Sequence, residues 1–123
     1  MYEVFAYKDK NGESPIDSYI GELMSKEDKD SRIKANKILE YIAYLQRYGV
    51  QAREPYVKHL EGDIWELRPI RDRIFYATWD GNSFILLHLL KNKDTQKTPR
   101  RDIEQAKRNL ADYREREGSK ENE

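Results

Sequence analysis

The sequence predicts a single α+β domain in which a small antiparallel sheet packs on a hairpin of two helices. Apolar residues recur at a helical period in two segments near the N-terminus and again near the C-terminus. Between these segments the apolar residues follow the pattern of three consecutive strands. Helices that stand before and after a run of strands are typical of α+β domains, and 123 residues fit one such domain.

A short strand and a helix are expected first. Residues 4–7 form an apolar run that ends in a turn sequence at Gly12. Ser14 then precedes Pro15, which favours a helix start because serine caps the first turn and proline fits the first helical position. Apolar side chains at spacings of three and four continue this helix to about residue 24.

The strongest predicted helix spans residues 26–48, where no glycine or proline occurs before Gly49. We expect it to cover one face of the sheet and to leave the other face open and concave. Tyr41, Tyr44 and Tyr48 form a second stripe beside its apolar face. Either the helix packs on two sides, or this stripe is a patch for a partner protein.

Three strands follow a polar connection at residues 51–60. They are predicted at 64–70, 73–79 and 83–90, and their short turns make an antiparallel meander. The third strand is apolar on both faces, so we expect it in the interior of the sheet.

A last helix completes the predicted order β-α-α-β-β-β-α. Thr98 and Pro99 start it by the same capping logic, and one apolar stripe reaches residue 113. The domain is therefore expected to span residues 1–113. Residues 114–123 carry charge without an apolar side chain, which predicts a disordered tail.

Composition excludes several classes of protein. The absence of cysteine excludes disulfide frameworks, thiolate metal sites and cysteine nucleophiles. No apolar run approaches the roughly 18 residues of a membrane span, and residues 1–13 lack the apolar core of a signal peptide, so we expect a cytoplasmic protein. His59 and His88 stand far apart without carboxylates at ligand spacing, which predicts no metal site.

Basic side chains gather where the meander brings strand ends together. The chain carries 23 basic and 23 acidic residues, so its net charge is zero. In a meander, the end of the first strand, the start of the second and the end of the third meet at one end of the sheet. We expect three cationic groups to converge there: Arg68, Arg71 and Arg73; Lys91 and Lys93; and Lys97. Arginine and lysine in this arrangement suit phosphate, and the alternative is a solvated basic rim.

The same residues carry a resemblance to a known family. The segments 58–68, 73–76, 89–93 and 96–99 resemble the HigB-type toxins of the RelE superfamily, in their phage-derived branch, and the resemblance covers nearly all of residues 1–113. It implies a RelE-like fold and a type II toxin that cuts mRNA in the ribosomal A site. It also implies a helix-turn-helix antitoxin that silences the toxin and represses its own operon, so operator DNA is reached only through the antitoxin.

The resemblance also implies site residues. It maps the family's basic face onto Arg68, Arg73, Lys91 and Lys93, with Arg73 at the position of a catalytic arginine. Many relatives stack a late aromatic residue on the substrate base. The only late aromatic residue here is Tyr113, on the apolar stripe of the last helix, which leaves Tyr76 as a weak substitute.

Metal-free RNA cleavage needs a base for the 2′-hydroxyl, an acid for the leaving 5′-oxygen and positive charge for the transition state, and it requires no cofactor. The candidate bases are Lys91 or Lys93, whose pKa neighbouring cations lower, and His59 in a loop, which is otherwise a surface histidine. His88 is expected to be a packed or hydrogen-bonded strand residue. Further substrate contacts are expected from Arg71, Lys58, Tyr76 and Lys97, and antitoxin contacts from Tyr41, Tyr44 and Tyr48.

Two other functions stay open at this point. A ParE-like toxin of the same superfamily would inhibit DNA gyrase instead of cutting RNA. A small RNA-binding adaptor would bind RNA without turnover.

Overall fold

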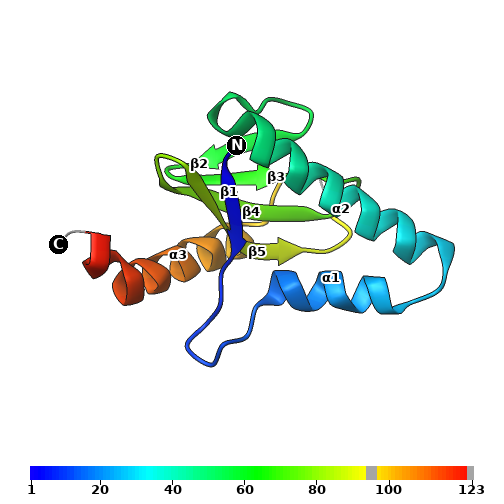
Figure 1. Ribbon diagram of the computed structural model, residues 1–123, viewed down its shortest axis with the longest axis horizontal. Coiled ribbons are helices and arrows are strands. Elements are labelled where there is room, and N and C mark those ends of the chain that lie inside the picture. The colour runs from blue at the N-terminus through cyan, green and yellow to red at the C-terminus, as the bar shows by residue number, and fades with distance from the viewer. Residues whose placement is uncertain (94–96, 122–123) are drawn as a thin grey trace.

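The computed structural model describes residues 1–93 and 97–121, with the backbone alone for 119–121, and it has the predicted α+β fold (Figure 1). Five strands form one sheet, and three helices flank it. In chain order the elements are β1 (Glu3–Ala6), α1 (Pro15–Ser25), α2 (Lys29–Tyr48), the 3₁₀ turn η1 (Gly49–Gln51), β2 (Val57–Glu61), β3 (Ile64–Leu67), β4 (Arg73–Asp80), β5 (Ser83–Leu90) and α3 (Arg100–Glu121).

Local capping explains where the first two helices begin. The Ser14 side chain accepts a 3.2 Å hydrogen bond from the amide of Asp17, which confirms the predicted start of α1. The second helix begins three residues later than expected, at Lys29. The carboxylate of Asp28 caps it by accepting a 2.9 Å hydrogen bond from the amide of Ser31.

The sheet has the strand order β1-β5-β4-β3-β2, in which β1 and β5 are parallel and the other neighbours are antiparallel. This order confirms the interior position of β5. The expected polar connection at 51–60 is wrong in part, because residues from Val57 onward form the edge strand β2. Polar side chains of an edge strand can stay in solvent, and Lys58 and His59 are exposed. The sequence of β2 therefore lacks the apolar alternation that predicts a strand.

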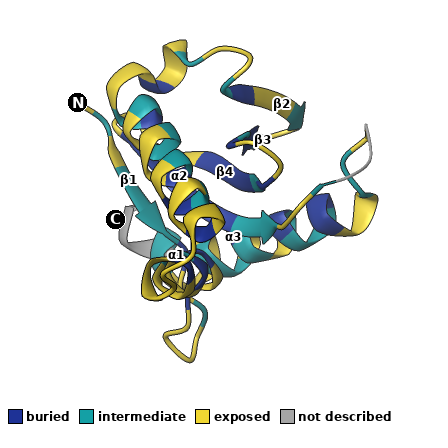
Figure 2. Ribbon diagram, turned by 90° about the vertical axis from the view of Figure 1, so that its right-hand side faces the viewer, coloured by how far each residue is buried: buried dark blue, intermediate teal, exposed yellow. Residues whose placement is uncertain are grey.

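Helices cover both faces of the sheet, so the expected open, concave face is wrong (Figure 1). On one face Ile74 and Leu86 pack against α1 and α2. On the other face Phe75 and Leu87 pack against Ile103 and its neighbours in α3. Figure 2 shows β4 buried between these layers, while the outer side of α2 is exposed. The apolar stripe of α3 requires this cover, since solvent would otherwise reach it.

The last helix differs from the expectation at both of its ends. It begins at Arg100, one residue later than expected, and the hydroxyl of Thr98, the expected cap, binds Glu66. It continues to Glu121, past residue 113, where the sequence predicts the end of the domain. Arg114 pairs with Asp63 at 3.1 Å, and Arg116 donates a 2.5 Å hydrogen bond to the carbonyl oxygen of Lys8, so both side chains connect the charged part of the helix to the rest of the domain. No helix in the described ranges is long and apolar enough to cross a membrane.

Candidate functional site

A buried carboxylate lies at the centre of the cationic end of the sheet. Glu66, in β3, is only 1% exposed. Its Oε1 lies 3.6 Å from Nε of Arg68 and 3.8 Å from Nε of Arg73. Its Oε2 accepts a 3.0 Å hydrogen bond from Oγ1 of Thr98. One side chain therefore connects β3, β4 and the segment that leads into α3.

Sequence reasoning missed Glu66, although one signal was present. It is the acidic residue within the short strand β3, and it lies opposite the buried Phe75 in the register of β3 and β4. A charged residue at such a position needs compensation, because a carboxylate loses hydration when it is buried. The neighbouring arginines supply that compensation.

Backbone carbonyls hold the guanidinium of Arg73 in place. Its Nη1 donates hydrogen bonds to the carbonyl oxygens of Asp72, at 2.8 Å, and Ile70, at 3.1 Å. The side chain is 12% exposed. Burial lowers the pKa of Arg73, and the nearby charge of Arg68 lowers it further, although an arginine stays protonated in proteins. Arg73 is therefore a rigid cation. Among the described residues, none forms a hydrogen bond with its Nη2.

Two lysines complete this group. Lys58 lies directly opposite Glu66 in the register of β2 and β3. Burial lowers the pKa of Lys93; the charge of Glu66 opposes this shift, while Arg73, Arg68 and Lys58 contribute to it. Leu90 at the end of β5 is paired with Arg73, and the amide of Lys93 bonds to the carbonyl oxygen of Arg71, so Lys93 lies at the same end of the sheet. We call Lys58, Arg68, Arg73 and Lys93 the cation cluster.

Lys91 lies apart from the cation cluster, contrary to the expected convergence. Its Nζ is 4.7 Å from the ring centroid of Tyr19, in a pocket between α1, α2 and the end of β5. In an extended chain, residues two apart point the same way, so Lys91 and Lys93 should lie together. Asn92 between them has a φ of 51°, and this left-handed residue turns the two side chains apart.

His59 also lies apart, because it is in β2 and not in a loop. It is paired with Trp65, on the sheet face opposite to that of Lys58. Its Nε2 is 2.8 Å from the carbonyl oxygen of Gly62, and its ring centroid is 4.8 Å from that of Trp65. These contacts fit the alternative of a surface histidine better than a place beside the cations.

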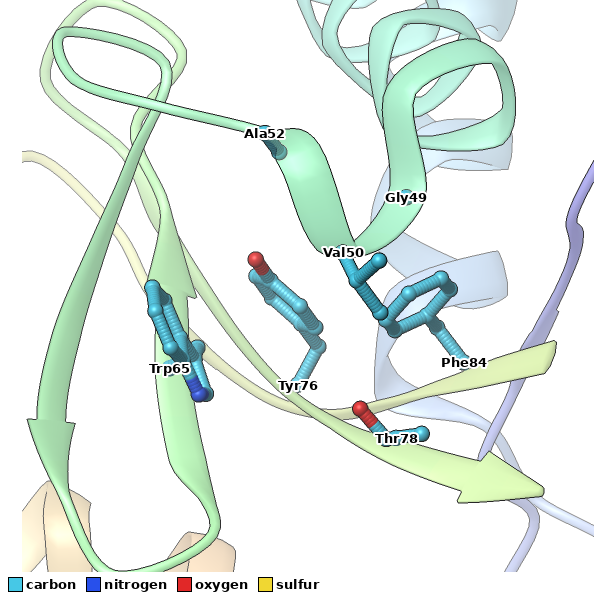
Figure 3. Close-up of a pocket in the computed structure, with 7 residues that line it drawn as sticks. All are labelled: Gly49, Val50, Ala52, Trp65, Tyr76, Thr78 and Phe84. Carbon is cyan, nitrogen blue, oxygen red and sulfur yellow. The ribbon is translucent and has the colours of Figure 1, made fainter. Parts of the chain in front are cut away.

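Tyr76, the substitute that the sequence offers for stacking on the substrate base, is buried in the domain. It is 3% exposed and belongs to the core under α1 and α2. Figure 3 shows its ring between Trp65 and Val50, beside a cavity of about 90 Å³. Burial raises the pKa of Tyr76. The alternation of β4 places Tyr76 and Arg73 on opposite faces of the sheet.

Arg71 and Lys97 lie at the same end of the sheet as the cation cluster, with exposed side chains. The carbonyl oxygen of Arg71 accepts a 2.6 Å hydrogen bond from the amide of Lys93. Lys97 precedes Thr98, whose hydroxyl binds Glu66. Residues 94–96 of the basic segment lie outside the described residues.

The tyrosine stripe of α2 packs largely within the domain. Tyr44 stacks on Tyr56 with centroids 4.0 Å apart, and Tyr41 lies 5.0 Å from the same ring. The Tyr44 hydroxyl accepts a 3.1 Å hydrogen bond from the amide of Arg53. For Tyr41 and Tyr44 the structure favours packing on two sides, whereas Tyr48 is 41% exposed.

Two further polar contacts involve the buried carboxylates of Asp72 and Asp102. Asp72 accepts hydrogen bonds from the Tyr19 hydroxyl, at 2.8 Å, and from the amide of Asn92, at 2.9 Å. His88 forms a 2.8 Å contact through Nε2 with Asp102, as expected for a hydrogen-bonded strand residue. In the described part of the chain, no three histidine, aspartate or glutamate side chains are grouped as metal ligands would be.

A mixed five-stranded sheet between a helical hairpin and a C-terminal helix, with cations gathered at one end, is compatible with the RelE-like fold. Residues 24–111, more than two thirds of the chain, match the phage-derived Gp49-like protein family (DUF891). The protein therefore belongs to this family, which is a family of RelE/HigB-like toxins. Membership implies an antitoxin partner. No curated protein matches the chain.

Proposed function

We propose that this protein is a ribosome-dependent mRNA endonuclease of a type II toxin–antitoxin system. One observation carries the proposal beyond family membership. The cation cluster draws side chains from β2, the residue after β3, β4 and the segment after β5 to one end of the sheet, where Glu66 is buried. Preorganised cations on rigid elements suit a phosphodiester, because its oxygens gain negative charge in the transition state.

In the proposed reaction the 2′-hydroxyl of the RNA attacks the adjacent phosphate. The 2′-oxygen gives its proton to the base, the bond from phosphorus to the 5′-oxygen breaks, and solvent water protonates the leaving oxygen, which leaves a cyclic phosphate and a 5′-hydroxyl. Arg68 and Arg73 stabilise the charge on the phosphate oxygens through their planar guanidinium groups. Lys93 is the preferred base, because its lowered pKa gives it a larger neutral fraction near neutral pH than an ordinary lysine has.

In this proposal the ribosome positions the mRNA substrate. A translating ribosome holds the mRNA in a fixed conformation, and such alignment lowers the barrier for an attack within one chain. A helix-turn-helix antitoxin would silence the protein in the resting cell.

A cell-free translation reaction tests the proposal. A defined mRNA is incubated with the full chain, with and without ribosomes, and cleavage is mapped by primer extension. We expect cuts only when ribosomes are present, and cleavage slowed by about 10–10²-fold in Arg73→Lys, which keeps the charge and loses the planar donor.

Two outcomes would overturn the proposal. Intact mRNA together with blocked DNA supercoiling by gyrase would indicate a ParE-like toxin. RNA binding without cleavage, in both the presence and the absence of ribosomes, would indicate an adaptor.

A further inference from the structure

Glu66 occupies a position where stability alone does not require a charge. Its neighbours Ile64 and Leu67 are buried, and it faces Phe75 across the register of β3 and β4. Replacing a buried ion pair with apolar side chains of similar volume often leaves a protein equally or more stable. A glutamate here therefore suggests a task other than packing.

The geometry around Oε1 indicates what this task is. The atom lies 3.6 Å from Nε of Arg68 and 3.8 Å from Nε of Arg73, within ion-pair distance of each but beyond hydrogen-bond distance. Among the described residues, none of these three buried atoms has a hydrogen bond. The carboxylate thus acts through space on two cations at once. Without it, the two guanidinium groups would repel each other.

The second carboxylate oxygen extends this arrangement to the last helix. Oε2 accepts a 3.0 Å hydrogen bond from Oγ1 of Thr98, two residues before Arg100 begins α3. The Nε edges of both arginines face inward to Glu66, and Nη1 of Arg73 is held by backbone carbonyls. The contacts with Glu66 and with the two carbonyls therefore fix the orientation of the remaining donors of Arg73 before any ligand binds.

We infer that Glu66 is a positioning residue, whose buried carboxylate sets the spacing of Arg68 and Arg73 for one phosphate group of RNA. The inference rests on the proposed function and deepens it. Glu66 is too buried to contact the substrate, so it acts through the arginines. Because Thr98 binds Oε2 of Glu66, the spacing of Arg68 and Arg73 also depends on where α3 begins.

The test compares Glu66→Gln with the control Glu54→Gln. Glutamine keeps the shape of the side chain and an oxygen for Thr98, but it removes the charge. Glu54 is exposed and lies 3.9 Å from Nη1 of the same Arg68, so its variant removes a carboxylate from the outside of the site. Both variants and the wild type are measured for thermal unfolding, affinity for a single-stranded RNA oligonucleotide, kcat on ribosomes, and the NMR signals of the arginine Nε–H groups.

We expect Glu66→Gln to bind the oligonucleotide at least as tightly as the wild type, because the site loses a negative charge. Its kcat should fall by about 10–10²-fold, as for other losses of alignment, and the Nε–H signals of Arg68 and Arg73 should move. Glu54→Gln should match the wild type in kcat. Unchanged arginine signals and an unchanged kcat in Glu66→Gln would overturn the inference.

A second variant keeps the inference testable if Glu66→Gln does not fold. Thr98→Val removes the hydrogen bond to Oε2 and keeps every charge, so it should lower kcat by a few-fold and shift the same arginine signals. Arginine signals identical to those of the wild type would contradict the coupling to α3. A wild type that does not cut RNA would overturn the proposed function, whereas the arginine signals would still decide the role of Glu66.

Discussion

The backbone amide of Lys93 donates a 2.6 Å hydrogen bond to the carbonyl oxygen of Arg71. This contact joins the segment after β5 to the connection between β3 and β4. The amide of Asn92 reinforces it through the carboxylate of Asp72, at 2.9 Å. Because the two segments are tied together, Lys93 lies in the cation cluster while Lys91 turns away. Backbone contacts between distant segments thus decide which cations can act on one phosphate.

Arg73 should matter for both the activity and the stability of the protein. Arg73→Ala should lower the free energy of unfolding by about 1–3 kcal/mol, because two backbone carbonyls lose a donor and buried Glu66 loses a counter-charge. Arg73→Lys should fold normally and lose most of the cleavage activity. Urea unfolding and ribosome-dependent cleavage measure these effects. If Arg73→Ala had the stability and the cleavage rate of the wild type, Arg73 would not be part of the active site.

Tyr48 is the clean test of antitoxin binding on α2, because it is exposed while its stripe neighbours are packed. Tyr48→Ser should weaken the complex by about tenfold or more, as for an aromatic contact at an interface, with little change in thermal unfolding. Ile33→Ser is the matched control, since Ile33 is 43% exposed near the other end of the same helix. Calorimetry with the purified antitoxin measures both. Equal affinities for wild type and Tyr48→Ser would place the interface elsewhere.

Glu61 should make the stability of the protein depend on pH. Hydrogen bonds from Arg100 and Lys107 of α3 hold the pKa of Glu61 at about 2, below its ordinary 4.5. A lowered folded-state pKa contributes stability above pH 4.5 that is lost as the pH falls toward 2. Glu61→Gln should therefore be less stable than the wild type at pH 7, and the difference should vanish near pH 2. Urea unfolding across this range measures it, and a difference that is constant with pH would contradict the prediction.

Gly49 should resist substitution more than Gly62, although both have a φ of 52°. A Cβ at Gly49 would lie 2.2 Å from the ring of Tyr2, whereas nothing lies within 4 Å of one at Gly62. Gly62→Ala should cost about 1–2 kcal/mol for the left-handed backbone. Gly49→Ala adds the displacement of Tyr2 and should cost on the order of 3 kcal/mol. Equal losses in urea unfolding would show that Tyr2 moves aside freely.

Local patterns were sufficient to predict most elements. The Ser14–Pro15 start of α1 follows from a side chain and its nearest amides, which no distant residue alters. The alternation in β3, β4 and β5 likewise reports burial along a single strand. The meander order then places Arg68, Arg73 and Lys93 at one end of the sheet, because antiparallel neighbours return to the same end.

Contacts between distant segments decided the rest. β2 is a strand because β3 offers it an edge, although its exposed residues show no apolar alternation. Tyr76 is core because α2 covers its face of the sheet, which the sequence of β4 does not state. The carboxylate of Glu66 is buried because Arg68, Arg73 and Thr98 reach it from three segments. Periodicity and capping describe how a residue relates to its neighbours in the chain, whereas the desolvation of a charge depends on every element that surrounds it.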